Sequence, residues 1–318
     1  NNFKRDLFMR KIVALFPGQG SQSAGMGKSL CEIFPEGKKI FEEANSVLGF
    51  NLQELCFNGD KEELKKTAIA QPAILTVSFI AFKVLQELFA EKVEVVGACG
   101  HSLGEYSALV AAEALSFKEA VRLVHLRGKF MQEAVAPGKG KMAAIIGAKL
   151  SEIEELLLEI KDKGVCEVAN INTPQQIVVS GDKGAVDEFL KICPFKSVEL
   201  LVSAPFHCSL MKPAEEKLAC ELEKITFKLP KFSVYHNFHA KKADTAQEIA
   251  DLLRKQVSAP VRWVECVENA FKECGTDEGI EFGNGKVIKG LLRKINPSFK
   301  CYSLGEGKDV ELLKVKFS

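Results

Sequence analysis

The sequence predicts an α/β fold in which a large parallel-sheet core is interrupted by a small inserted domain. Apolar segments typical of buried strands alternate with helical segments over most of the chain, a pattern that favours a parallel sheet covered on both faces. The motif Gly-x-Ser-x-Gly stands between one such strand and the next helix. After Gly138 the order of elements changes to βαββαβ, which indicates a separate ferredoxin-like unit.

The composition is that of an ordinary globular protein and excludes several classes of function. The 318 residues are 47% hydrophobic, and 43 basic against 42 acidic side chains leave a net charge of +1, so we expect no nucleic-acid partner. Ten cysteines contain no Cys-x-x-Cys pair, so we expect no metal site and a reducing, cytoplasmic location. No apolar run approaches the length that spans a bilayer, so we expect no membrane association.

The first part of the large domain is predicted to cover residues 9–136. Its elements are the strand 11–16, helical stretches, the helix 72–89, the strand 93–98, the helix 105–112 and a helix from 117 to about 135. Pro72 is expected in the first turn of its helix, where its missing N–H removes no bond. Ser116 and Glu119 form a capping box that opens the last helix. Residues 1–8 precede a methionine and are expected to be a cloning remnant.

Residues 137–204 are predicted to form the inserted domain, and residues 205–318 return to the large one. The inserted elements are the strand 142–147, the helix 151–163, the strands 165–171 and 176–180, the helix 182–192 and the strand 196–202. The second part of the large domain contributes the helices 209–224, 245–257 and 285–295 and the strands 232–237, 279–283 and 300–304. A cleft between two such domains is a favoured place for a ligand.

The segment Gly100-His101-Ser102-Leu103-Gly104 is typical of a nucleophile elbow. The sharp turn presents the serine hydroxyl at the start of a helix, where main-chain N–H groups can stabilise an oxyanion. The alternative is a glycine-rich turn that happens to hold a serine. The strand before it and the helix after it favour the elbow.

A nucleophilic serine needs a base, and His207 is the predicted one. It lies where the chain leaves the small domain, and in hydrolase-type chain order the base follows the serine. His236 is the weaker candidate, and a lone histidine can also be structural. No aspartate stands out as the acid that orients the base, so a carbonyl group could hold the ring instead. With an ordinary histidine base, rates are expected to rise with pH near ~6.5.

Arg127 lies on the apolar face of its predicted helix, because Val124 and Met131 stand three residues before and four residues after it. A buried guanidinium needs an anionic partner. Two interpretations stay open on spacing alone. In the first, Arg127 is structural and either forms an ion pair or extends its guanidinium to the protein surface. In the second, its planar guanidinium binds the carboxylate of a substrate.

Four segments together resemble the bacterial malonyl-CoA:acyl carrier protein transacylases, and the resemblance extends from about Ile12 to about Leu304. The segments are Phe16-Pro17-Gly18-Gln19-Gly20-Ser21-Gln22, Gly100 to Leu109, Arg127 to Gln132 and His207 to Pro213. The family's fold is a hydrolase-like α/β core with a ferredoxin-like insert, as expected above. Its members move malonyl from coenzyme A to acyl carrier protein in fatty-acid biosynthesis.

The resemblance implies catalytic roles for five residues. Ser102 is implied as the nucleophile that carries malonyl as an ester, and His207 as its general base. Gln256 is implied as the residue whose main-chain carbonyl orients the histidine, in place of the missing aspartate. Gln19 and the main-chain N–H of Leu103 are implied as the oxyanion hole.

The resemblance also implies substrate-binding residues and partners. Arg127 is implied as the clamp on the free carboxylate of malonyl, and His101, Asn170 and Asn172 as further substrate-binding residues. Malonyl-CoA and acyl carrier protein are the implied partners, no cofactor is expected, and nothing in the sequence demands more than a monomer. Two alternatives stay open: a serine esterase or thioesterase, which has no use for a buried cation, and a catalytically inactive module that binds acyl carriers.

Overall fold

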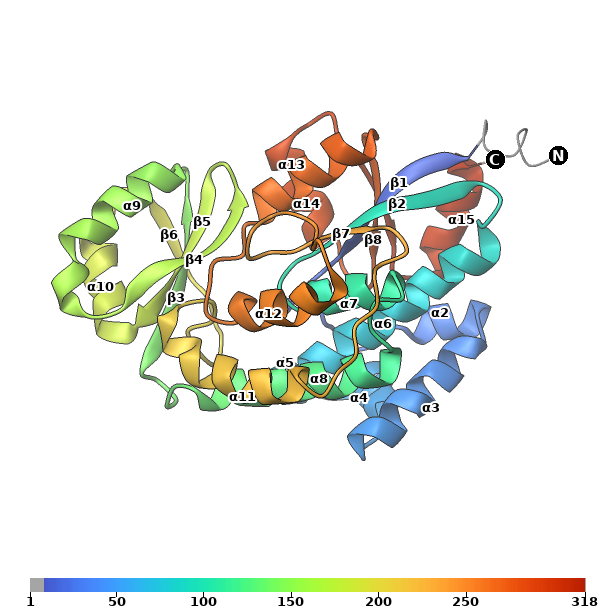
Figure 1. Cartoon of the computed structure of the whole chain (residues 1–318), viewed down its shortest axis with the longest axis horizontal. Coiled ribbons are helices and arrows are strands. Elements are labelled where there is room, and N and C mark those ends of the chain that lie inside the picture. Colours follow the sequence, from blue (N-terminus) through green and yellow to red (C-terminus); the bar gives the residue numbers. More distant parts are fainter. Residues whose placement is uncertain (1–8, 318) are drawn as a thin grey trace.

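The computed structural model describes residues 9–317, and it confirms the predicted α/β class (Figure 1). One sheet is five-stranded and parallel, in the order β7-β2-β1-β8-β9. The other is four-stranded and antiparallel, in the order β4-β5-β3-β6. The expected cloning remnant, residues 1–8, lies outside the described residues.

The parallel sheet and its helices form the larger part of the molecule. Its strands are β1 (Arg10–Phe16), β2 (Val93–Gly100), β7 (Ser233–Tyr235), β8 (Glu278–Phe282) and β9 (Lys300–Leu304). Its helices are α2 (Lys28–Ile33), α3 (Glu36–Leu48), α4 (Leu52–Asn58), α5 (Lys61–Lys65), α6 (Thr67–Leu88), α7 (Gly104–Ala111), α8 (Phe117–Glu133), α11 (Lys212–Leu222), α12 (Ala246–Gln256), α13 (Trp263–Cys274), α14 (Val287–Ile295) and α15 (Gly307–Lys316).

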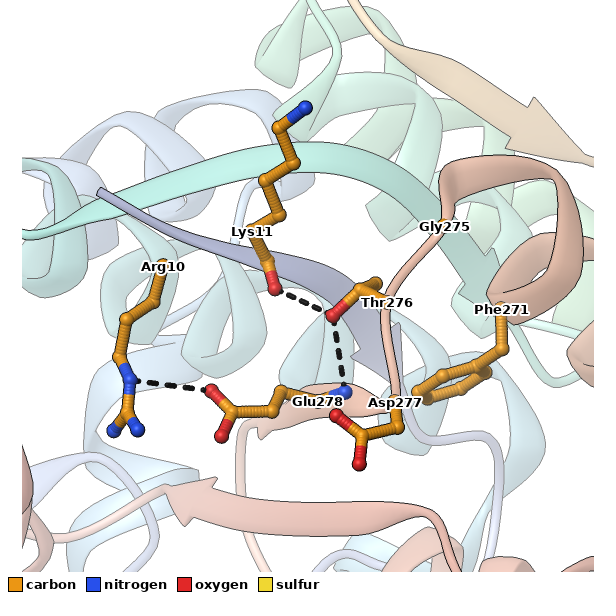
Figure 2. Close-up of a pocket in the computed structure, with 7 residues that line it drawn as sticks. All are labelled: Arg10, Lys11, Phe271, Gly275, Thr276, Asp277 and Glu278. Atoms are coloured by element: carbon orange, nitrogen blue, oxygen red, sulfur yellow. Dashed lines mark hydrogen bonds and ion pairs between the residues drawn. The ribbon is translucent and has the colours of Figure 1, made fainter. Parts of the chain in front are cut away.

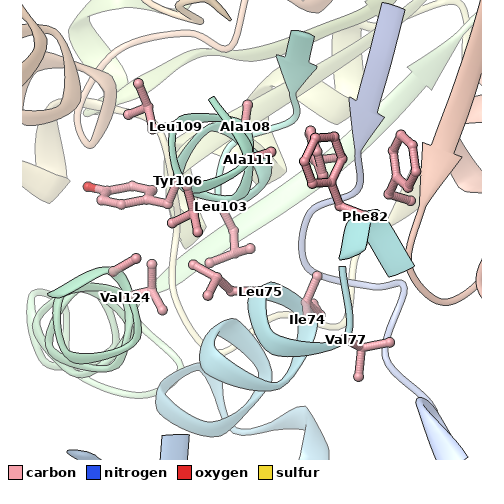
Figure 3. Packing of buried hydrophobic residues seen from close by; sticks show 14 of the residues in the cluster. Ile74, Leu75, Val77, Phe82, Leu103, Tyr106, Ala108, Leu109, Ala111 and Val124 are labelled. Carbon is pink, nitrogen blue, oxygen red and sulfur yellow. The ribbon is translucent and has the colours of Figure 1, made fainter. Parts of the chain in front are cut away.

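Helices cover both faces of this sheet and therefore bury β1 on both sides. Ile12 and Phe16 pack into the cluster that includes α6, α7 and α8, whereas Val13 and Leu15 pack into the cluster of α13 and α14. Successive side chains of a strand point to opposite faces, so a continuous apolar run serves two cores. Beneath the start of α7, side chains of three helices interlock, among them Leu75 of α6 (Figure 3).

The small sheet has the βαββαβ order that the sequence predicted. Its elements are β3 (Gly140–Ile146), α9 (Leu150–Glu159), β4 (Cys166–Thr173), β5 (Gln176–Asp182), α10 (Lys183–Ile192) and β6 (Lys196–Glu199), with short 3-10 helices at Lys161–Lys163 and, after β6, at Ser209–Met211. The edge strand β4 also forms main-chain hydrogen bonds with Val261, which lies between α12 and α13 of the larger part. Ile171 N donates to Val261 O at 2.9 Å, and Val261 N donates to Ala169 O at 2.8 Å.

The predicted helix start at Pro72 is wrong, because α6 begins five residues earlier, at Thr67. Pro72 therefore lies inside the helix, where it cannot donate to the carbonyl of Ala68. That carbonyl accepts instead from Nδ1 of His125 on α8, at 2.8 Å. A side chain from a neighbouring helix thus satisfies the group that proline leaves unpaired, which a sequence reading of α6 alone does not foresee.

The expectation that no segment is long and apolar enough to cross a membrane is also wrong for α6. By length and composition this 22-residue helix qualifies, but 78% of its most apolar 18-residue window is buried inside the protein. Gln71, Thr76 and Ser78 interrupt the apolar run in the sequence, yet all three are buried. Such burial is typical of a central core helix.

The remaining differences concern element ends and two helices that the sequence analysis did not assign. The helix expected over 209–224 is a 3-10 turn followed by α11, and the strand expected over 196–202 ends at Glu199. The unassigned helices are α13 and α15. Just beyond the end of β6, Leu200 N still donates to Met142 O of β3 at 3.0 Å.

Candidate active site

The Gly-x-Ser-x-Gly turn is a nucleophile elbow in the structure as well. β2 ends at Gly100, α7 begins at Gly104, and Ser102 between them has a φ of 51°, in the left-handed region. A Cβ on Gly100 would lie 1.9 Å from the carbonyl carbon of Gly104, and a Cβ on Gly104 would lie 2.1 Å from Phe16 O. Only glycine fits at both positions, which explains the spacing of the motif.

Ser102, His207 and the main chain of Gln256 form a linear hydrogen-bonded relay. Ser102 Oγ lies 2.7 Å from His207 Nε2, and His207 Nδ1 lies 3.0 Å from Gln256 O. A carbonyl oxygen can only accept, so Nδ1 carries the proton and Nε2 is free to accept from the serine hydroxyl. A carbonyl therefore occupies the place of the missing aspartate.

Burial keeps the imidazole of His207, the predicted base, neutral over a wide pH range. Its side chain is 4% exposed, and loss of solvation, followed by the positive charge of Arg127, lowers its pKa to about 3. The hydrogen bond to Gln256 O opposes this shift in part. The expectation of a titration near ~6.5 assumed an exposed imidazole, and the buried ring shifts it to lower pH.

Arg127 is buried beside the nucleophile and bonds neutral groups. Nη1 donates to Gln71 Oε1 at 2.8 Å, and Nη2 donates to Ser102 Oγ at 3.0 Å and to Gln256 Oε1 at 2.9 Å. Within the described residues its Nε has no hydrogen-bond partner, and burial lowers the pKa of the guanidinium. Of the two interpretations that the sequence left open, these contacts support a guanidinium aimed at the nucleophile more than a structural ion pair.

A cavity of about 320 Å³ opens onto these groups between the two sheets. Its walls include Gln19, Leu103, Asn170 and the apolar side chains of Met131 and Phe206. Gln19 Nε2 donates to Thr67 Oγ1 at 3.2 Å, so its amide is already held at the wall of the cavity. The structure thus brings both implied oxyanion-hole residues to the nucleophile, and their roles stay predictions.

His101 and Asn172 link the elbow to the small domain. His101 Nε2 lies 2.7 Å from Asn172 Oδ1, on β4, and the imidazole also packs against the ring of Trp263. Burial lowers the pKa of His101, which keeps its ring neutral. Asn170 lines the cavity, whereas Asn172 reaches it through His101.

The structure contradicts His236 as an alternative base. Its side chain is fully buried, and its Nδ1 lies 2.6 Å from Glu105 Oε1 rather than near Ser102. Glu105 was missed by the sequence analysis, although it directly follows the elbow. It accepts from Gln256 Nε2 at 2.7 Å and from the main-chain N–H of Asn237 at 2.9 Å. No motif pointed to this contact, because its members are more than 130 residues apart in the sequence.

A larger surface hollow, of about 600 Å³, lies at the amino-terminal ends of the parallel strands β1 and β8 (Figure 2). It is lined by the first residues of β1 and β8. Arg10 there pairs with Glu278 at 3.4 Å, and Thr276 Oγ1 donates to Lys11 O at 2.7 Å. Arg10 also donates to Lys316 O at 3.3 Å, and Asp277 pairs with Lys300 at 2.8 Å, so these side chains make contacts typical of structural residues. Within residues 9–317 no cluster of side chains suits a metal ion either.

Comparisons with known proteins point to one family. The model of the acyl transferase domain matches residues 13–287. The chain is 41% identical to the malonyl CoA-acyl carrier protein transacylase of Escherichia coli strain K12, over 94% of this chain and 97% of that protein. The enzyme of the same name from Bacillus subtilis strain 168 is 41% identical over 96% of both chains.

Solved structures agree with the sequence relatives. The malonyl CoA-acyl carrier protein transacylase of Coxiella burnetii superposes with a TM-score of 0.93 at 36% identity, over 98% of both chains. A malonyl-transacylase solved in complex with its type II PKS acyl-carrier protein superposes with a TM-score of 0.90 at 40% identity, over 95% of this chain and 98% of that one.

Proposed function

This chain belongs to the acyl transferase family and resembles its malonyl CoA-acyl carrier protein transacylases over nearly its whole length, and on that premise we propose how its site works. It transfers malonyl from malonyl-CoA to the phosphopantetheine thiol of acyl carrier protein, in fatty-acid biosynthesis. The transfer runs in two half-reactions through an ester on Ser102. Each half-reaction uses the same base and the same oxyanion site.

In the first half-reaction Ser102 Oγ attacks the thioester carbonyl of malonyl-CoA. His207 Nε2, 2.7 Å away, takes the hydroxyl proton, and the bond between His207 Nδ1 and Gln256 O steadies the ring as it becomes charged. The main-chain N–H of Leu103 and the amide of Gln19 stabilise the oxyanion. The carbon–sulfur bond then breaks, and coenzyme A leaves with the proton from His207.

In the second half-reaction the pantetheine thiol of acyl carrier protein replaces coenzyme A. His207 takes the thiol proton, and the sulfur attacks the ester carbonyl. The bond to Ser102 Oγ breaks, and His207 returns the proton to the serine. A thioester is made from a thioester, so the overall exchange is nearly balanced in energy, and the ester intermediate splits it into two similar steps.

One observation carries the choice of malonyl: the buried guanidinium of Arg127 at the nucleophile. Its Nη2 lies 3.0 Å from Ser102 Oγ, and its side chain is 1% exposed. An acyl group on Ser102 places its far end beside this cation. The carboxylate of malonyl supplies a direct ion pair through two parallel N–H···O bonds, whereas a neutral acyl chain offers the guanidinium no anionic group.

The same contacts speak against a thioesterase. A thioesterase must deliver water to the ester, whereas here the base is buried and is oriented by a carbonyl rather than by a carboxylate. A neutral carbonyl stabilises the imidazolium less than a carboxylate does, which favours an acidic thiol over water as the second nucleophile. The alternative of an inactive carrier-binding module does not account for the aligned serine and histidine.

We further propose that the protein works as a cytoplasmic monomer and needs no metal or other cofactor. The steps above use only side chains and main-chain groups of one chain. The free cysteines, among them the buried Cys99 and Cys208, fit a reducing compartment.

Mass spectrometry of the intact protein after mixing with malonyl-CoA tests this function most directly. We expect a malonyl adduct on Ser102 that disappears when holo acyl carrier protein is added, with malonyl then found on the carrier. Ser102→Ala is the matched control and forms no adduct. An adduct that is lost to water as fast without the carrier as with it would support the thioesterase, and no adduct at all would support the binding module.

A further inference from the structure

The side chain of Asn237 bridges the two main-chain groups on either side of the elbow turn. Its Oδ1 accepts from the N–H of Ser102 at 2.7 Å, and its Nδ2 donates to the carbonyl of Gly100 at 2.8 Å. We propose that Asn237 is the positioning residue of the nucleophile: it locks the turn so that Ser102 Oγ faces the base. The proposal rests on the proposed role of Ser102.

The elbow needs such a lock because Ser102 is in an unfavourable conformation. A residue with a Cβ seldom adopts the left-handed region, and Ser102 holds a φ of 51° there. A strained residue keeps its conformation only where its surroundings determine it. Two hydrogen bonds from one rigid amide, to residues i and i+2 of the turn, leave the peptide units around Ser102 little freedom to rotate.

The sheet itself delivers Asn237 to this place. β7 pairs in parallel with β2, with Tyr235 opposite Cys99, so the residues just beyond both strands lie side by side. Asn237 is fully buried, and its own main-chain N–H donates to Glu105 Oε2 at 2.9 Å. Its Oδ1 also accepts from Gln256 Nε2 at 3.2 Å. Hydrogen bonds to Glu105 of α7 and Gln256 of α12 therefore hold Asn237 in place just beyond β7.

The chemistry of the two bonds requires an amide at position 237. The side chain must accept at one atom and donate at the other, and a neutral amide does both. An aspartate there accepts from Ser102 N, but it donates to the carbonyl of Gly100 only when protonated. The titratable groups that face it are Glu105 from α7 and, at 3.9 Å, the thiol of Cys266 from α13, whose pKa burial raises. These surroundings favour the protonated acid at low pH and oppose the ionised one.

The test is the rate at which phenylmethanesulfonyl fluoride labels the serine of the full chain, measured from pH 5 to pH 8. For the wild type we expect a rate nearly independent of pH, because His207 stays neutral in this range. Asn237→Asp is expected to label at least about tenfold more slowly at pH 8 and to recover toward pH 5. Asn237→Ser, which is neutral but too short to bridge both groups, is expected to label more slowly by a similar factor at every pH.

Asn269→Asp is the matched control. Asn269 Nδ2 donates to the carbonyl of Ala240 at 2.9 Å, also at a residue with positive φ, but away from the nucleophile. This variant is expected to label at the wild-type rate and pH profile. If it slows as Asn237→Asp does, the effect is general to the loop and the proposal is overturned.

Wild-type labelling at every pH by a folded Asn237→Ser also overturns the proposal, as does wild-type labelling by a folded Asn237→Leu, which can form neither bond, where the serine variant does not fold. Circular dichroism reports which variants are folded. The sulfonyl fluoride requires neither malonyl nor a carrier. A wild type that is labelled but transfers no malonyl therefore contradicts the proposed function and leaves the role of Asn237 standing.

Discussion

At the scale of single residues, the buried guanidinium of Arg127 makes no direct ion pair within the described residues, although the carboxylate of Glu105 acts on it from beyond hydrogen-bond distance. Its hydrogen-bond partners within the described chain are two amide oxygens and the hydroxyl of Ser102. A buried cation without a counter-charge is costly, and that cost is relieved when an anion binds. We therefore expect Arg127 to lower the stability of the protein without substrate and to favour binding of a proposed acidic substrate.

Arg127→Ala is expected to lower kcat/KM for malonyl-CoA by about 100-fold or more, equivalent to ~2.7 kcal/mol of lost binding in the transition state. Transfer of acetyl is expected to fall less than about tenfold, since acetyl offers no carboxylate. Arg127→Lys keeps the charge but loses the planar fork, so its kcat/KM for malonyl-CoA should lie between those of the wild type and Arg127→Ala. Steady-state kinetics with both acyl donors measures the ratio, and equal losses for the two donors would contradict the clamp.

The lowered pKa of His207 predicts an unusual pH profile for acylation. A pKa of about 3 leaves the ring neutral from pH 5 to pH 8, so the single-turnover rate of Ser102 malonylation should stay within about twofold there. It should fall only below about pH 4, as the base becomes protonated. Rapid-quench measurement of the malonyl adduct gives this rate without the second half-reaction. An apparent pKa near 6.5 would show that His207 is more solvated than its burial indicates.

At the scale of elements, local patterns predicted the elbow well and the boundaries of α6 poorly. Strand, turn and helix around Ser102 follow from adjacent residues, because the two glycines are required by contacts within the turn and with β1. The true start of α6 depends on His125, whose ring reaches the carbonyl that Pro72 leaves unpaired. Positions that depend on a partner from another helix cannot be read from one periodic segment.

The start of α14 depends on an acidic residue from another element. Glu281, at the end of β8, accepts from the N–H groups of Ile288 and Lys289, each at 3.0 Å, whereas the residue that precedes the helix provides no side-chain cap. Burial nevertheless raises the pKa of Glu281 from 4.5 to about 7. The folded protein therefore holds this proton more tightly than the unfolded chain does.

Because its pKa is raised in the folded protein, the contribution of Glu281 to the free energy of unfolding decreases as the pH rises. The contribution of Glu281 to stability is fully present below pH 4.5 and is lost as the pH rises through about 7. The free energy of unfolding of the wild type, minus that of Glu281→Gln, should thus decrease between these pH values, by up to about 1.4 kcal/mol per pH unit. Urea unfolding of both proteins across this range measures the difference, and a constant difference would contradict the raised pKa.

At the scale of the whole molecule, hydrogen bonds connect the small domain to the elbow and to the segment that holds His207, the proposed base. Asn172 of β4 contacts His101 of the elbow, and Glu167 of the same strand accepts from Ser209 N at 2.7 Å and from Ser209 Oγ at 2.6 Å. Ser209 is two residues beyond His207. The position of the small sheet therefore helps to set the position of the base.

Glu167→Ala is expected to lower kcat for malonyl and acetyl by the same factor, roughly tenfold, because a displaced base slows every acyl group alike. Asp187→Ala is the control: Asp187 pairs with Lys141 and Lys183, within the small domain, and its loss should leave kcat unchanged. Comparison of both variants with the wild type at saturating donor measures the effect. A loss confined to malonyl would instead place Glu167 in the malonyl clamp.

The fold class, the inserted unit and the pairing of Ser102 with His207 could be predicted from the sequence, because the motif and the order of elements along the chain carry that information. The contacts of Glu105 with His236 and of Asn237 with Gly100 were not predicted, because they join residues 131 and 137 positions apart through the pairing of β7 with β2. Contacts created by the order of strands in a sheet have no local pattern from which they can be predicted.

Ser102 and His207 share a backbone feature with a consequence for the evolution of this enzyme. Both have positive φ, 51° and 59°, although neither is glycine. Each costs the folded protein about 1–3 kcal/mol that glycine would recover. Glycine at either position would therefore relieve strain but remove a side chain on which the proposed reaction depends. Gains in heat resistance that keep this reaction must come from other positions, so relatives of this chain are expected to differ in stability there while both strained residues persist.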